Sequence, residues 1–124
     1  MAVPVTATVI TCNEAANIKA ALESLSWADE LIVVDSESTD DTVAIARQFT
    51  DRVIVRAWPG YVAQKNFAAE QASHDWIFSL DADERVSPAL ASEMRDVLKS
   101  GGAAVGYRVP RVTFHLGRWI RSTD

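Results

Sequence analysis

The feature that most constrains the fold of this chain is a regular alternation of strand-like and helix-like segments. Apolar runs rich in Val and Ile predict strands at Val3–Ile10, Leu31–Val34, Arg52–Arg56, Trp76–Leu80 and Ala103–Phe114. Apolar residues or alanines at helical spacing predict helices at Ile18–Leu25, Val43–Phe49, Tyr61–Ala72 and Leu90–Leu98. We therefore expect an α/β fold in which helices cover both faces of a mostly parallel sheet. A length of 124 residues suits one domain, spanning residues 1–124.

Polar residues and helix breakers mark the expected ends of these helices. The expected N-caps are Asn13 for the first helix, Ser38 or Thr39 for the second, and Ser87 before Pro88 for the last. Asp40 and Asp41 suit the positive end of the second helix. Gly101-Gly102 predicts the end of the last helix, and Pro110 predicts an edge position or a bulge in the last strand.

Composition and charge exclude several classes of protein. The formal net charge of -5 disfavours nucleic-acid binding through a basic surface. We expect a cytoplasmic protein, because no apolar run is long enough for a membrane span and the N-terminus lacks the features of a signal peptide. Cys12 is the single cysteine, which rules out an internal disulfide. Four arginines between Arg108 and Arg121 suit a phosphate or a lipid surface, and a solvated edge with no partner suits them equally.

Polar side chains follow three of the predicted strands at the point where each strand ends. They are Thr11 and Asn13 after the first strand, Asp35 after the second, and Asp81 and Asp83 after the fourth. Because ligands of such sheets bind beyond the carboxyl ends of the strands, we expect these side chains to share one site. Two carboxylates one residue apart repel each other unless a cation lies between them, and their oxygens suit Mg2+ or Mn2+. Taken alone, Asp81-Ala82-Asp83 is equally compatible with a solvated turn.

Other acid-bearing α/β proteins differ from this chain at a defining residue. Phosphate-accepting receiver domains carry an acidic pair after the first strand, where this chain has Thr11-Cys12-Asn13. Haloacid-dehalogenase-like phosphatases carry Thr or Val two residues after their Asp-x-Asp motif, where this chain has Arg85. The dinucleotide-binding fingerprint needs glycines after the first strand, and this chain has none there.

Three segments resemble, in order and spacing, the N-terminal motifs of the nucleotide-sugar-dependent glycosyltransferases of family 2, which have the GT-A fold. These segments are Val9–Glu14, Ile32–Asp40 and Leu80–Glu84. A narrower likeness is to the branch of that family that adds sugars, often glucose, to the inner core of lipopolysaccharide. The segments that carry the narrower likeness are Gly60–Phe67, Asp81–Val86 and Gly106–Arg111.

The resemblance implies a role for each residue of the expected site. It implies donor-binding roles for Thr11, Asn13, Asp35, Lys65 and Asp81, and metal binding by Asp83 together with Asp81. In the family the metal, Mg2+ or Mn2+, bridges the diphosphate of the donor, here expected to be a UDP-sugar. Lys65 stands where the family usually has arginine, so it can meet a phosphate only as a point charge. A solvated helix residue is the alternative for Lys65.

The resemblance also implies that this chain is the N-terminal, donor-binding part of a longer enzyme. Relatives of this kind run to roughly twice this length or more, beyond one domain of typical size. An inverting transfer needs a carboxylate base, which we expect beyond Asp124 because Glu84 lies too close to the donor motif. We therefore expect residues 1–124 to be inactive alone.

Three expectations about the whole protein remain open at this stage. The expected acceptor is lipopolysaccharide core or another glycolipid or oligosaccharide, with peripheral contact at the cytoplasmic face of the inner membrane as an open possibility. A non-catalytic nucleotide-binding or assembly module of the same fold is the main alternative to an enzyme. A metal-dependent phosphate-transfer enzyme of the phosphatase kind is a third hypothesis for the function.

Overall fold

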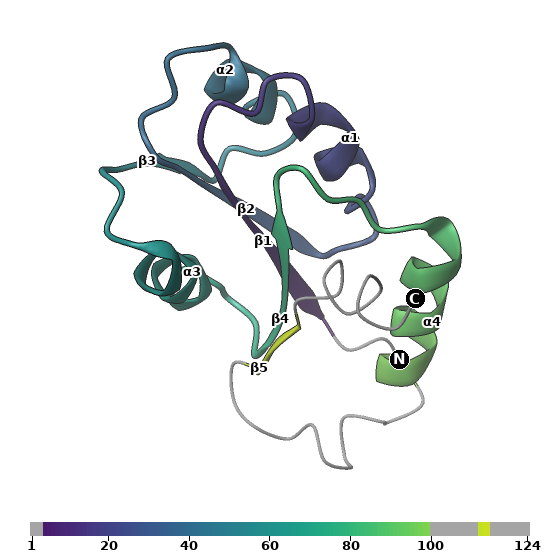
Figure 1. Cartoon of the computed structure of the whole chain (residues 1–124). Coiled ribbons are helices and arrows are strands. Elements are labelled where there is room, and N and C mark those ends of the chain that lie inside the picture. Colours follow the sequence, from purple (N-terminus) through teal and green to yellow (C-terminus); the bar gives the residue numbers. More distant parts are fainter. Residues whose placement is uncertain (1–3, 100–111, 115–124) are drawn as a thin grey trace.

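The computed structural model describes residues 4–99 and 112–114, which form five strands and four helices (Figure 1). The strands are β1 (Val5–Thr11), β2 (Glu30–Asp35), β3 (Val53–Val55), β4 (Trp76–Asp81) and β5 (Val112–Phe114). The helices are α1 (Ile18–Glu23), α2 (Thr42–Ala46), α3 (Tyr61–Glu70) and α4 (Pro88–Lys99). None of these helices is both long and apolar enough to cross a membrane.

All strand pairs in the sheet are parallel, and the strand order is β3-β2-β1-β4-β5. The chain moves outward from β1 to β3 on one side and then returns to place β4 on the other side of β1. Ligands of open α/β sheets bind where the strand order reverses in this way, here between β1 and β4. The register aligns Thr11 with Asp35 and Ile10 with Asp81, so the three central strands end at nearly the same level.

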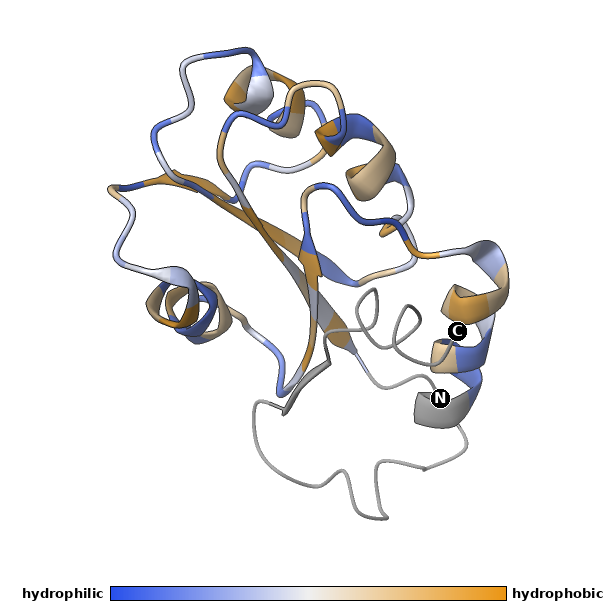
Figure 2. Cartoon of the chain, viewed as in Figure 1, coloured by the Kyte–Doolittle hydropathy of each residue, from blue (hydrophilic) through white to orange (hydrophobic). Residues whose placement is uncertain are grey.

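Two apolar layers hold the helices against opposite faces of the sheet. On one face α1, α2 and α4 pack on alternate residues of β1, such as Ala7 and Val9, and on Phe78 of β4. On the other face α3 packs on Ile10, through small residues such as Ala68. Figure 2 shows the apolar strands between helices that carry both apolar and polar residues. This arrangement confirms the expected α/β fold with helices on both faces of the sheet.

The elements form where the sequence predicts them, whereas two of the predicted N-caps are wrong. Asn17 rather than Asn13 precedes α1, and Asp41 rather than Ser38 or Thr39 precedes α2. Asp40 lies near that helix start, and hydrogen bonds donated by the hydroxyl and the backbone N–H of Thr42 hold the pKa of its carboxyl below the usual range.

The expectations for the C-terminal elements fall partly within the described residues. The N-cap role of Ser87 is confirmed, because its hydroxyl accepts the backbone N–H of Leu90 at 3.1 Å. The predicted helix end at Gly101-Gly102, the strand residues 103–111 and the bulge at Pro110 lie outside the described residues. Of the predicted last strand the structure describes β5, which pairs with β4 in parallel.

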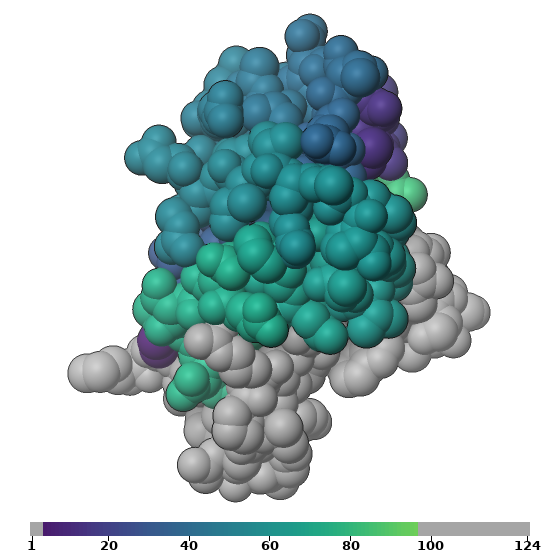
Figure 3. All heavy atoms as spheres, turned by 90° about the vertical axis from the view of Figure 1, so that its left-hand side faces the viewer, coloured from purple at the N-terminus to yellow at the C-terminus, as the bar shows by residue number. Residues whose placement is uncertain are grey.

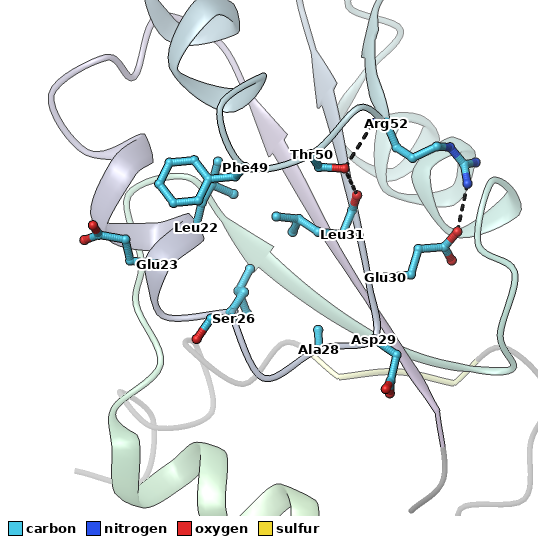
Figure 4. A pocket seen from close by; sticks show the side chains of 11 residues that line it. Leu22, Glu23, Ser26, Ala28, Asp29, Glu30, Leu31, Phe49, Thr50 and Arg52 are labelled. Atoms are coloured by element: carbon cyan, nitrogen blue, oxygen red, sulfur yellow. Dashed lines mark hydrogen bonds and ion pairs between the residues drawn. The ribbon is translucent and has the colours of Figure 1, made fainter.

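Glu30, the first residue of β2, ties together the amino end of the sheet. Its carboxylate accepts hydrogen bonds from the Thr6 hydroxyl at 2.7 Å and from the backbone N–H and hydroxyl of Ser73, both at 2.8 Å. The Arg52 guanidinium forms an ion pair with it at 2.8 Å (Figure 4). Burial raises the pKa of Glu30, but the hydrogen bonds from Ser73 and Thr6 and the charge of Arg52 outweigh burial and leave the pKa lowered.

Replacement of Glu30 should therefore weaken the fold. Glu30→Gln is expected to reduce the free energy of unfolding by about 1–3 kcal/mol, because the amide cannot accept the same set of charge-assisted hydrogen bonds. Since the folded-state pKa is lowered, the stabilisation is complete above the unfolded-state value of 4.5 and is lost as the pH falls through the folded-state pKa. Urea unfolding at pH 7 and at pH 3 measures both effects. A wild type to mutant difference that is the same at both pH values would contradict this assignment.

Candidate functional site

A cavity of about 270 Å³ lies at the carboxyl edge of the sheet, where β1 and β4 end. It is lined by Ile10, Thr11, Cys12, Glu14, Trp58, Tyr61, Asp81, Ala82 and Asp83. The structure thus brings together Thr11 and the acidic pair, as the sequence predicts. The other three residues of the expected donor site, Asn13, Asp35 and Lys65, lie outside the lining of this cavity.

The acidic pair lies in a tight turn that Glu84 closes. The backbone N–H of Glu84 donates to the carbonyl oxygen of Asp81 at 2.9 Å, and the Glu84 carboxylate accepts the backbone N–H of Asp81 at 3.0 Å. Glu84 is only 3% exposed, whereas Asp83 at the tip of the turn is exposed. The sequence does not predict these two hydrogen bonds, because Glu84 is one of several acidic residues in a polar segment.

Asp81 has a different environment from Asp83, because two side chains of α3 contact its carboxylate. The Tyr61 hydroxyl lies 3.3 Å from both carboxylate oxygens, and Lys65 Nζ lies 3.5 Å from Oδ1. Tyr61 reaches this position because Gly60, immediately before the helix, has a φ of 113°, a conformation that residues with a Cβ rarely adopt. The sequence motifs assign no role to Tyr61, although the segment Gly60–Phe67 contains it.

Thr11, the last residue of β1, lines the cavity and carries a buried hydroxyl. The residue is 5% exposed, and its Oγ1 has no hydrogen-bond partner among the described residues. A buried hydroxyl without a partner costs free energy in the folded protein. Rotation of the Thr11 side chain toward the cavity and a hydrogen bond with a bound ligand would remove this cost.

Asp35 lies at the end of β2 and is fully buried, at 0% exposed. Its carboxylate accepts the backbone N–H of Ser38 at 2.7 Å and the Ser38 hydroxyl at 2.5 Å. Next to it, the Ser36 hydroxyl accepts the side-chain amide of Gln64 on α3 at 3.0 Å. These contacts hold the loop after β2 against the sheet edge, beside the cavity.

Asn13 joins the loops that follow β1 and β2. Its side-chain oxygen accepts the backbone N–H of Thr39 at 2.8 Å and that of Asp40 at 3.4 Å, and its own backbone N–H donates to the Ser38 hydroxyl at 2.7 Å. Asn13 has a φ of 52° and Glu37 has a φ of 56°, so each loop carries a left-handed residue. Asn13 therefore supports the site from within the protein, and its direct contact with a donor stays a prediction.

The acidic pair suits a metal that is bound together with a diphosphate. Among residues 4–99 and 112–114, no group of three or more His, Cys, Asp or Glu side chains could hold a metal ion alone. Mg2+ commonly binds through one or two carboxylates plus phosphate oxygens and water. The exposed carboxylate of Asp83 and the neighbouring Asp81 supply the hard oxygen ligands for that arrangement and too few for an all-protein site.

A larger cavity of about 810 Å³ lies at the opposite, amino edge of the sheet (Figure 4). Leu22, Leu31 and Phe49 provide apolar walls, and the ion pair of Glu30 and Arg52 closes one side. Both charged groups are engaged in contacts that hold the fold, so the size of this cavity does not make it the functional site. Figure 3 shows the α3 side of the molecule, where the teal atoms include those of α3.

Solved structures with the same fold identify the class of this domain. Glucosyl-3-phosphoglycerate synthase from Mycobacterium tuberculosis, in complex with Mg2+ and UDP, superposes with a TM-score of 0.59 and 28% identity over 66% of this chain and 34% of the synthase. Staphylococcus aureus TarS in complex with UDP-GlcNAc superposes with a TM-score of 0.66 and 22% identity over 80% of this chain and 32% of TarS. The chain has the fold of the GT-A glycosyltransferases.

Sequence comparison gives the family. The family model of glycosyl transferase family 2 matches residues 6–124, and the chain belongs to this family. An uncharacterized glycosyltransferase of Rickettsia felis is 52% identical over 97 residues, which are 77% of this chain and 34% of the relative. The lipopolysaccharide core biosynthesis glycosyltransferase LpsC of Rhizobium meliloti is 39% identical over 119 residues, 92% of this chain and 44% of LpsC. The chain thus spans a third to under half of these relatives' lengths.

Asn13 offers a direct test of the loop junction. Asn13→Ala removes the hydrogen bonds to Thr39 and Asp40 and puts alanine, which tolerates the left-handed region less well than asparagine, at a φ of 52°. This should cost about 1–2 kcal/mol of unfolding free energy. Asn13→Gly removes the same bonds without the backbone penalty and should be about 1 kcal/mol more stable than Asn13→Ala. Urea unfolding of both variants measures the difference. Equal stability of the two, or a more stable alanine variant, would show that the left-handed backbone is not required there.

Proposed function

We propose that this chain binds a UDP-sugar together with Mg2+ or Mn2+ and provides the donor site of a glycosyltransferase. The observation that carries the proposal is the cavity at the carboxyl edge, which is lined both by Thr11, whose buried hydroxyl has no partner among the described residues, and by the acidic pair Asp81 and Asp83. Support comes from the M. tuberculosis synthase, solved with Mg2+ and UDP and, at 26% identity to this chain, with Mn2+, UDP and glucosyl-3-phosphoglycerate.

Different side chains of the cavity would bind different parts of the donor. The Thr11 hydroxyl would form a hydrogen bond with the nucleoside. Thr11 lies beside the loop that Asp35 holds in place. Asp83, with Asp81 behind it, would bind the metal at the diphosphate. When bound, the metal stabilises the negative charge that builds on the leaving diphosphate as the sugar bond breaks. The same proposal includes a hydrogen bond that the Asp35 carboxylate accepts from the base or the ribose. This bond requires that one of the two hydrogen bonds between Asp35 and Ser38 opens.

The acceptor and the stereochemistry belong to the whole protein. We propose lipopolysaccharide core or another glycan as acceptor, on the basis of the likeness to LpsC, and inversion at the sugar carbon. Glu84 does not suit the role of catalytic base, because it is buried and its carboxylate is bonded to the backbone of Asp81. A base contributed by sequence beyond residue 124, a cytoplasmic location and peripheral membrane contact stay predictions.

Asp83 tests the metal site. Isothermal titration calorimetry should show that the protein binds UDP more tightly in the presence of Mn2+ than in its absence. Asp83→Asn should reduce that metal-dependent gain by at least about tenfold, because it removes the charged ligand, and should leave the melting temperature unchanged because Asp83 is exposed. Asp75→Asn, another exposed aspartate, is the matched control. Undiminished metal dependence in Asp83→Asn would move the metal elsewhere, and no metal-dependent UDP binding at millimolar concentrations by the wild type would oppose the proposal.

Substitution of Thr11 distinguishes a role in nucleotide binding from a role in folding. Thr11→Val removes a buried hydroxyl that has no partner in the protein, so the unfolding free energy should stay equal or rise by up to about 1 kcal/mol. UDP affinity should fall by about 5–30-fold if the hydroxyl bonds the nucleotide. Thermal melting and titration with UDP measure the two effects. A variant that is less stable but binds UDP normally would assign Thr11 to the fold alone.

A further inference from the structure

Lys65 is held behind the acidic pair rather than in the cavity. It lies on α3, and its Nζ donates to the Ser79 hydroxyl at 2.8 Å and contacts Asp81 Oδ1 at 3.5 Å. The side chains of Lys65 and Asp81 are only 15% and 19% exposed, so water screens this ion pair less than a surface pair. Lys65 does not line the cavity, whereas Asp81 does.

Tyr61 completes the enclosure of this lysine. Lys65 Nζ lies 5.1 Å from the centre of the Tyr61 ring, within range of a cation–π contact. The Tyr61 hydroxyl contacts both oxygens of Asp81 at 3.3 Å. The ammonium group therefore has a hydroxyl, a carboxylate and an aromatic face around it, and its position is fixed before any ligand binds.

The two acids of the pair consequently differ in charge balance. Asp81 already has a cationic partner from within the protein. Asp83 is exposed and forms no hydrogen bond or ion pair with the residues that the structure describes. A divalent cation at the pair would therefore contact the carboxylate of Asp83 and that of Asp81, which is already paired with Lys65. The ammonium group of Lys65, 3.5 Å from Asp81 Oδ1, would repel this cation.

Electrostatics then favours joint binding of the cation and a diphosphate. Like charges a few ångströms apart in a partly buried site repel with more than thermal energy, so the ammonium group disfavours a lone cation. A nucleotide diphosphate brings negative charge that attracts both the cation and Lys65. By linkage, the factor by which the diphosphate tightens cation binding equals the factor by which the cation tightens diphosphate binding.

We propose that Lys65 is a resident counterion of Asp81 that suppresses binding of a free divalent cation and makes the cation bind together with the nucleotide diphosphate. Lys65 is thus a positioning residue, and this assignment rests on the donor-binding function proposed above. It differs from direct phosphate binding by Lys65, in which loss of the ammonium group would weaken UDP binding and leave binding of the free cation unchanged.

The test measures Mn2+ binding in the absence and presence of UDP. The electron paramagnetic resonance signal of free Mn2+ is titrated with wild-type protein and with Lys65→Met, Lys65→Gln and Lys65→Arg. Both neutral variants should bind Mn2+ alone about tenfold more tightly than wild type. Saturating UDP should then tighten Mn2+ binding by a smaller factor in them than in wild type. Lys65→Arg keeps the charge and should behave like wild type, as should Lys19→Met, which removes an exposed lysine of α1.

The outcomes separate this inference from the proposed function. If wild type binds Mn2+ and UDP jointly but neither neutral variant gains affinity for Mn2+ alone, the counterion role is wrong and the donor site stands. If wild type shows no joint binding, both proposals fail. Circular dichroism of each variant establishes that it is folded, and Lys65→Gln, which retains a donor for Ser79, provides the second neutral variant should Lys65→Met lose structure.

Discussion

The parallel pairing of β1 with both β2 and β4 is the constraint on which the rest of the structure depends. Its register places Thr11 beside Asp35 and Ile10 beside Asp81, so residues far apart in sequence end their strands at one edge. A slip of one residue in β1 would turn Thr11 to the opposite face of the sheet and expose the apolar residues that now face α1 and α4. The burial of these residues fixes the register, and the register in turn assembles the cavity.

Much of this fold is readable from sequence because the signals are local. The apolar run at Leu31–Val34 predicts β2, and the alternation of strand-like and helix-like segments predicts the order of the elements. The predicted strand end at Ile10 and the observed end at Thr11 differ by one residue, within the usual uncertainty of such boundaries. The helix starts are less predictable, because Asn13 uses its side chain for a loop that lies about 26 residues further along the chain, and no local pattern reveals such a partner.

The candidate site is predictable in its residues but not in their orientation. Thr11, Asp81 and Asp83 reach the cavity because strand ends of a parallel sheet converge, and this follows from the topology. Lys65 and Glu84 illustrate the other case, since a helix lysine and an acid in a turn can point toward solvent, a ligand or the protein. The hydrogen bond from Lys65 to Ser79 of β4 fixes the orientation of the lysine, and the hydrogen bond from the backbone of Asp81 fixes that of Glu84.

Cys12 gives this architecture a practical consequence. It is the single cysteine of the chain, it is exposed, and it lines the cavity between Thr11 and the acidic turn. Its thiol donates to the Ser36 carbonyl oxygen at 3.4 Å, which holds the sulfur near the end of β2. A thiol-directed dye would therefore attach to the native chain at one known point, and its emission would report occupancy of the cavity without any engineered residue.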